Sequence, residues 1–188
     1  MKKLTMAAMA ILFCFSGAAS AQSARRTSSM SSTHHETFFV STELEFGMPI
    51  GNYSDVNGVG GGVMLVGEYP LLDALSATAR IGFQYHANKA LSPTVDVHVH
   101  SIPILLGAKY YLMPDRQGLF GAFELGLFDL MTSAGNTSQN DLKFGTGIGV
   151  GYAMKQWNAR VNVHTQDVGS FADALMITAG VGYQFAGF

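Results

Sequence analysis

The chain has histidine, serine and acidic residues whose spacing could support metal or hydrolytic chemistry. His98 and His100 are two residues apart, so in a strand both imidazoles share one face, and Asp96 shares it too. A structural zinc site takes four protein ligands and a catalytic one three. The adjacent His34 and His35 have no further ligand nearby in the sequence. These residues therefore predict no metal site.

The same residues do not assemble a hydrolytic set. Ser101 follows His100 directly, so in a strand the two point to opposite faces, and His164 falls on the inward face of its own segment. The glycine run Gly145–Gly151 lacks the lysine and the following helix start of a phosphate-binding loop. We expect no enzyme activity and no cofactor.

Nearly every charged residue inside the alternating segments falls on one face. Four are acids and four are bases, namely Glu43, Glu45, Glu68, Glu124, Arg80, Lys109, Lys143 and Arg160. Charges enclosed in a protein interior must pair and form hydrogen bonds. We predict a structural ion-pair network in which Glu124 and Arg160 reach across the inward glycines of 145–151. A charge-lined pore is the alternative interpretation of the same face.

The elements that would hold these residues are strands. From Leu75 to His86 apolar and polar residues alternate with a period of two, which a strand sorts onto two faces and a helix does not. The same pattern marks eight segments, at about 38–48, 60–70, 75–87, 98–111, 119–130, 142–152, 157–166 and 174–185. Most have the length needed to cross a bilayer at a tilt.

The connections alternate between short and long. Those at 70–74, 112–118 and 153–156 are short, whereas those at 49–59, 88–97, 131–141 and 167–173 are mostly longer and polar. None can hold a crossover helix, so the strands must be antiparallel. The predicted fold class is all-β, an eight-stranded antiparallel up-and-down transmembrane β-barrel with both termini on the periplasmic side and the four longer loops outside.

Composition and the N-terminus agree with export to a membrane. Charged residues make up 13% of the chain, against about 25% in soluble domains. Residues 1–21, with Lys2, Lys3 and an apolar run, predict a signal peptide, and 22–37 a Ser/Thr-rich disordered leader before a barrel at 38–188. Cleavage would remove the only cysteine, Cys14, and leave 9 basic against 13 acidic residues, which predicts no nucleic-acid partner.

Three segments resemble the outer-membrane protein β-barrel family, related to the OmpA and OmpX eight-stranded barrels. They are GMPIGNYSDVNGVGGG at 47–62, SIPILLGAKYYL at 101–112 and ITAGVGYQF at 177–185. The resemblance implies an integral protein of the bacterial outer membrane whose partners are outer-membrane lipids and the assembly machinery. Family chains usually end on an outward aromatic; here Phe185 is in phase and Phe188 is not, unless the strand bulges near Gly187.

The expected function is non-enzymatic. A barrel with a plugged polar lumen would contribute to membrane integrity, or to surface interaction and adhesion through its four outer loops, with an extracellular ligand that the sequence does not name. Two alternatives stay open, a narrow pore for ions or small solutes and a soluble lipocalin-like carrier. The inward charges Glu43, Glu45, Arg80 and Arg160 disfavour the carrier, since they would occupy its ligand cavity.

Overall fold

The computed structural model describes residues 38–87, 89–92, 95–113, 115–134 and 137–188. The predicted signal peptide at 1–21 and leader at 22–37 lie outside these residues. The chain from Glu36 onward forms one compact unit, and that unit is the subject here. Among the described residues, no helix has the length and apolar character needed to cross a membrane.

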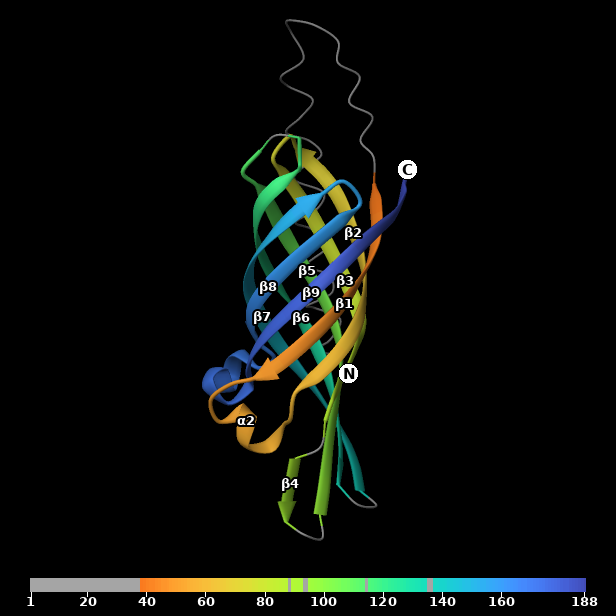
Figure 1. Cartoon of the computed structure of the whole chain (residues 1–188). Coiled ribbons are helices and arrows are strands. Elements are labelled where there is room, and N and C mark those ends of the chain that lie inside the picture. The colour runs from red at the N-terminus through yellow and green to blue at the C-terminus, as the bar shows by residue number, and fades with distance from the viewer. Residues whose placement is uncertain (1–37, 88, 93–94, 114, 135–136) are drawn as a thin grey trace, which may run out of the picture. The chain divides into compact units, whose positions relative to one another are not determined.

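The unit is a closed antiparallel barrel (Figure 1), which confirms the predicted fold class. Its strands are β1 (Phe39–Pro49), β2 (Gly60–Leu72), β3 (Leu75–His86), β4 (Lys89–Ser92), β5 (Val95–Tyr111), β6 (Gly118–Ala134), β7 (Thr137–Met154), β8 (Trp157–Thr165) and β9 (Leu175–Gly187). Pairing of β1 with β9 and of β3 with β5 closes the ring. The short β4 follows β3 and pairs with the same edge of β5. The nine segments therefore make a barrel of eight strands, with β3 and β4 at one strand position.

Alternation along each strand separates the lumen from the outer surface. In β1, Glu43 and Glu45 are buried, whereas Leu44 and Phe46 between and beyond them are exposed. Aromatic residues on the outward face are exposed as well, among them Tyr110, Tyr152 and Trp157. An apolar outside and a charged inside suit a barrel surrounded by hydrocarbon.

The two ends of the barrel differ in their connections. At one end, here named the short-turn end, the strands are joined through 73–74, 112–117 and 155–156. Arg116 and Lys155 have positive φ angles of 56° and 53° in these tight turns. At the opposite, long-loop end, the connections hold helix α2 (Tyr53–Val56) and the 3₁₀ helix η1 (Val168–Ala174).

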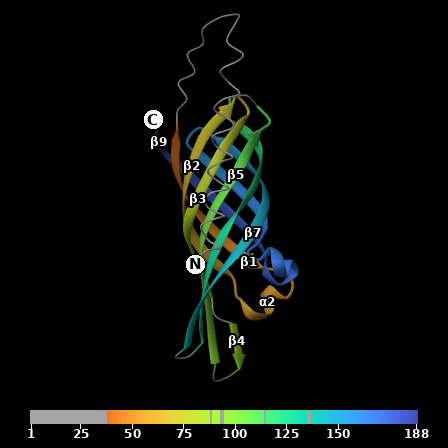
Figure 2. The ribbon, with the colours of Figure 1, turned by 180° about the vertical axis from the view of Figure 1, so that it is seen from behind.

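Three strands continue beyond the barrel at the long-loop end. β5 and β6 have 17 residues each and β7 has 18, and with β4 they form a sheet that projects past α2 (Figure 2). The loops expected at 88–97 and 131–141 are therefore largely strand. The sequence of these segments has no regular apolar and polar alternation, so the period-two rule does not identify them as strand.

A bulge in β9 changes the phase of the last residues. Ser41 pairs with Gln184 but Val40 pairs with Ala186, so Phe185 has no partner residue on β1. Beyond the bulge, the backbones of Phe38 and Phe188 exchange hydrogen bonds of 2.8 and 2.9 Å. Phe188 is thus opposite the outward Phe38, and the bulge lies at Phe185 rather than near Gly187.

Candidate functional site in the barrel lumen

Arg80 on β3 is the centre of the lumen charge cluster. Its Nη2 atom is 2.6 Å from Glu43 Oε2 and 2.5 Å from Glu45 Oε1, and its Nη1 atom is 2.8 Å from Glu124 Oε2. The guanidinium and both β1 carboxylates are buried. A guanidinium presents several donors in one plane, and so it can hold three carboxylates that would otherwise repel one another.

Arg160 on β8 extends the cluster to the opposite wall. Its Nη2 atom donates to Glu124 Oε1 at 2.7 Å and to Asn162 Oδ1 at 2.8 Å, and Nη1 is 3.9 Å from Glu43 Oε2. Glu124 therefore bridges the two arginines and joins β6 to both β3 and β8. Three carboxylates and two guanidiniums meet here.

The glycines of β7 provide the room for these contacts. Glu124 pairs with Gly147 and Arg160 with Gly151, so the ion pair crosses β7 where it has no side chains. A Cβ atom on Gly151 would overlap the ring of Phe120, and one on Gly149 would overlap the amide of Asn162. The stripe is thus filled by neighbouring side chains as well as crossed by the ion pair.

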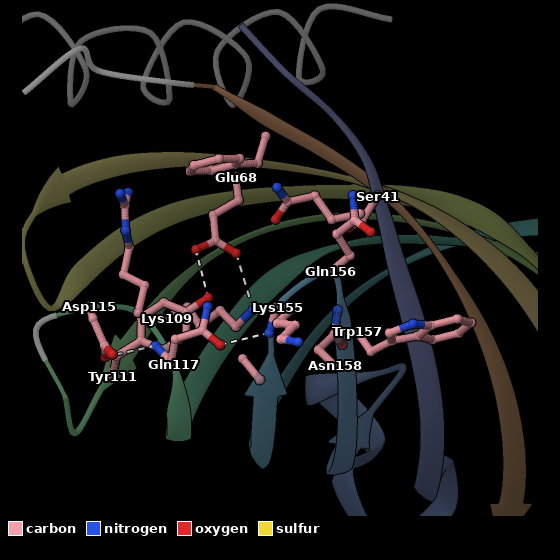
Figure 3. A pocket seen from close by; sticks show the side chains of 14 residues that line it. Ser41, Glu68, Lys109, Tyr111, Asp115, Gln117, Lys155, Gln156, Trp157 and Asn158 are labelled. Atoms are coloured by element: carbon pink, nitrogen blue, oxygen red, sulfur yellow. Dashed lines mark hydrogen bonds and ion pairs between the residues drawn. The ribbon is translucent and has the colours of Figure 1, made fainter.

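A second group lies toward the short-turn end. Glu68 on β2 accepts a hydrogen bond from Lys109 Nζ at 3.1 Å and from the Tyr111 hydroxyl at 2.8 Å. The same ammonium lies 4.2 Å from the centre of the Phe120 ring. This group lines a polar cavity of about 150 Å³ at the barrel mouth, shown in Figure 3.

The two turns at this mouth are tied together. Lys155 N donates to Gln117 Oε1 at 2.6 Å, which joins the turn between β7 and β8 to that between β5 and β6 (Figure 3). Asp115 Oδ1 accepts from Gln117 N at 3.2 Å and holds the second turn in shape. The mouth is therefore lined by side chains from linked turns.

Lys143 does not join the central cluster. Its Nζ atom is 3.0 Å from Asp141 and 3.2 Å from Asp167, at the long-loop end. Neither aspartate was among the predicted partners. Alternation predicts which face of the strand Lys143 lies on but does not predict its height along the barrel, and at this height its partners are Asp141 and Asp167.

Other lumen partners were not singled out in the sequence. Gln84 donates to Glu45 at 3.1 Å and accepts from the Ser101 hydroxyl at 3.1 Å. Asn162 and Tyr111 also bind the predicted residues directly. Each has inward parity, so extending the facing argument from charged to neutral polar residues would have found them.

Helix α2 packs at the long-loop end of the barrel. Tyr53 is buried, and its hydroxyl donates to Gln166 Oε1 at 2.7 Å. Burial raises the pKa of the Tyr53 hydroxyl to about 12, so it remains a neutral donor. Asn52 Nδ2 donates to Asp173 Oδ1 at 2.7 Å and links α2 to η1. These contacts join α2 to η1 and to the end of β8.

The histidine and serine residues considered for hydrolytic chemistry lie apart from one another. His100 is on the outward face, stacked on Tyr85 with ring centres 4.9 Å apart, whereas Ser101 is fully buried in the lumen. His164 stacks on Phe128 inside the barrel. Among the described residues, no group of three or more His, Cys, Asp or Glu side chains could hold a metal ion.

A model of the outer membrane protein beta-barrel domain family matches residues 7–185. The chain belongs to this family. It is therefore a barrel of the bacterial outer membrane, as predicted, with lipid around it. A search of curated proteins gives no match.

Two solved structures have a similar fold. Ail, the attachment invasion locus protein of Yersinia pestis, in complex with the heparin analogue sucrose octasulfate, is 13% identical, with a TM-score of 0.54 over 80% of this chain and 99% of Ail. Neisserial surface protein A is 16% identical, with a TM-score of 0.51 over 79% and 97% of the two chains. At these identities the likeness concerns the fold alone.

Proposed function

We propose that this outer-membrane barrel is a non-enzymatic surface-interaction protein whose projecting sheet binds an extended partner segment. The observation that carries the proposal is the open edge of β7. Pairing of β7 with β6 begins at Thr137, but pairing with β8 begins only at Thr146 in the described part of the chain. Residues 137–145 thus offer roughly 30 Å of strand edge.

An open edge of this length can add a strand from another protein. Its unpaired N–H and C=O groups give affinity, and side chains on alternating faces give specificity. Soluble proteins usually shorten, cover or charge such edges to prevent pairing. In an outer-membrane barrel, the same edge projects into water with the barrel as a fixed base.

The net negative charge of the four longer connections indicates what kind of partner can bind there. The connections 49–59, 88–97, 131–141 and 167–173 carry five aspartates and one lysine. Such a surface repels sulfated polyanions and attracts basic segments. We therefore expect a cationic partner here, in contrast to Ail, whose structure holds a heparin analogue.

The lumen supports a plug rather than a pore. The Arg80 and Arg160 cluster spans the interior from β1 to β8, and the buried Tyr53 of α2 packs against His86 toward the long-loop end. A conducting lumen would need water around these charges, whereas Arg80, Glu43 and Glu45 are buried. A lipocalin-like carrier needs an apolar cavity. Charged side chains fill the lumen instead, and the described lumen residues enclose no such cavity.

Two further roles follow from a rigid plugged barrel. It would contribute to outer-membrane integrity by occupying the bilayer without a leak, and its insertion would depend on the outer-membrane assembly machinery. Both roles are compatible with surface binding, because they use the barrel wall and leave the projecting sheet free.

The test uses the barrel in lipid nanodiscs and an array of extended peptides graded in net charge. We expect binding to rise with positive charge and to be lost when residues 130–141 are replaced by Asn-Gly, which joins the paired Asp129 and Leu142 by a two-residue turn and removes more than half of the edge. A control variant, Asp141→Lys, keeps the edge and should lose the preference for basic peptides. Absence of binding to every peptide, with steady conductance in planar bilayers, would favour the narrow pore.

A further inference from the structure

The polar cavity at the short-turn end has the size of a small ligand. Its volume of about 150 Å³ is roughly ten times what one water molecule requires. Glu68 and Lys109 of the barrel wall line it together with Lys155 and Asn158, which come from the turn between β7 and β8 and from the start of β8 (Figure 3). Neutral polar side chains complete the lining, namely Ser41, Gln117, Gln156 and Gln184. The cavity can therefore hold a polar molecule larger than water.

Two cations of this cavity have no carboxylate partner among the described residues. The carboxylate of Glu68 pairs with Lys109, and Asp115 accepts from a backbone N–H of its own turn. Neither Arg116 nor Lys155 forms an ion pair in the described part of the chain. Three cations and two acids line the cavity, so one positive charge is uncompensated. The whole chain has a formal net charge of −2, so composition does not account for a cationic mouth.

The backbone brings both cations to this mouth in a strained conformation. Arg116 and Lys155 are the two non-glycine residues with positive φ among those that the structure describes. Such a conformation costs a non-glycine residue free energy, and it persists where the surroundings enforce it, often at ligand-binding sites. The 2.6 Å bond from Lys155 N to Gln117 Oε1 is part of this restraint, because it ties Lys155 to the residue after Arg116. The two linked turns therefore present their cations to one cavity.

The Arg116 guanidinium also lacks a hydrogen-bond acceptor. It lies over the Phe39 ring, with 5.2 Å between its central carbon and the ring centre. Its Nη1 atom is buried and has no partner among the described residues, and one amide atom of the Asn158 side chain is in the same state. Buried donors of a charged group are costly to leave unpaired. An oxyanion would satisfy Arg116, and a neighbouring donor or acceptor of the same molecule would satisfy the Asn158 amide.

We propose that Arg116 and Lys155 make the short-turn mouth a binding site for a small water-soluble oxyanion, a carboxylate or a phosphate. A guanidinium presents parallel N–H donors to either group, and an ammonium adds a second positive charge. The lining includes the inward Glu68 and Lys109, so the ligand arrives from water rather than from lipid. With the short turns in the periplasm, as outer-membrane barrels place them, the ligand is a periplasmic solute. The site is at the opposite end from the projecting sheet and does not depend on the surface-interaction function.

The experiment titrates three small molecules into the refolded, ¹⁵N-labelled protein and follows its backbone and side-chain amides by NMR. Inorganic phosphate and N-acetylalanine supply the phosphate and the carboxylate, and N-acetylalaninamide is the neutral match of the second. We expect at least one anion to shift the amide resonances of Gln117, Lys155 and Asn158 saturably, and the neutral compound to leave them unchanged. The anion that binds more tightly identifies which oxyanion the site prefers.

Single substitutions assign the response to the two cations. Arg116→Asn and Lys155→Asn each remove one charge, and asparagine tolerates the positive φ of both positions. Each should weaken anion binding by about tenfold, the worth of a hydrogen bond to a charged group. Lys143→Asn is the matched control. It removes the same charge at the long-loop end, where Lys143 pairs with Asp141 and Asp167, and should leave the affinity unchanged.

Three results would overturn the site. One is the absence of saturable shifts at these amides with both anions. Another is an equal response to N-acetylalaninamide, which would mean that the site does not recognise charge. The third is an anion affinity that Arg116→Asn and Lys155→Asn leave as intact as Lys143→Asn does. The first two measurements use the unmodified protein, so they decide the question even if a variant fails to fold.

Discussion

At the scale of single residues, Arg80 and Arg160 differ in the number of buried carboxylates that they pair with. Arg80 contacts three carboxylates, whereas Arg160 makes one short ion pair, with Glu124. Glu124 keeps a 2.8 Å bond to Arg80 when Arg160 is lost. The cost of removing an arginine therefore depends on how many buried carboxylates lose their only cation.

We predict that Arg80→Met lowers the free energy of unfolding by about 3–5 kcal/mol, because Glu45 is left without its close partner. Arg160→Met should cost less. The double variant Glu124→Gln/Arg160→Met should cost less than the sum of its singles, because both partners of one ion pair are removed together. Urea unfolding of the barrel in lipid vesicles measures all four. Equal, small and additive losses would show that water solvates these charges.

At this scale the sequence predicts which side of a strand each residue points to, but it does not predict which residues form ion pairs with one another. Period-two alternation assigns Glu43, Arg80 and Lys143 to the lumen, because a strand allows only two directions. It contains no information on the tilt of the strands, and tilt decides which inward residues stand at the same height. For this reason Lys143 meets Asp167 instead of the central cluster.

At the scale of elements, the inward glycines of β7 are required because neighbouring side chains and backbone occupy the space that a Cβ atom would fill. We predict that Gly151→Ala destabilises the barrel by about 1–3 kcal/mol, since its Cβ would overlap Phe120 and the Ala159 carbonyl. Gly121→Ala on adjacent β6 is the matched control, because a Cβ there would have no described atom within 4 Å. Unfolding in urea compares the two. A control that suffers as much as Gly151→Ala would mean that backbone freedom, rather than space, requires the glycines.

The ends of the strands were harder to predict than their existence. Between Phe144 and Tyr152 lipid contact makes the outward residues apolar, and the pattern is clear. From Gln139 to Asp141 residues on both faces are exposed, and the sequence has no apolar alternation, so the same strand β7 has no pattern to detect. The bulge at Phe185 is likewise invisible to a rule that assumes unbroken alternation.

The lipid boundary on β7 can be located by paired substitutions. Ile148 and Asn140 share the outward face of this strand, and both are exposed. We predict that Ile148→Arg costs about 2–4 kcal/mol, as an arginine facing the bilayer midplane does, whereas Asn140→Arg stays near zero in the projecting sheet. Refolding into vesicles at graded urea concentrations tests both. Similar costs at the two positions would place the projecting sheet inside the membrane.

At the scale of the whole molecule, the orientation of the barrel decides whether the projecting sheet can meet a partner at all. The short-turn end has linked, compact turns, and the long-loop end has α2, η1 and the sheet. Outer-membrane barrels place short turns in the periplasm and long loops outside. Since the only cysteine is Cys14, in the predicted signal peptide, the mature protein would be free of thiols. Single cysteines can therefore report each end without interference.

We predict that Asn140→Cys reacts with a membrane-impermeant maleimide in intact cells, because Asn140 is exposed on the projecting sheet. Lys155→Cys, equally exposed at the short-turn end, should react only after the outer membrane is permeabilised. Both sites are in water, so differing reactivity in intact cells reports the side of the membrane rather than burial. Labelling of Lys155→Cys alone in intact cells would invert the barrel, direct the open edge of β7 into the periplasm, and make any partner of that edge a periplasmic one.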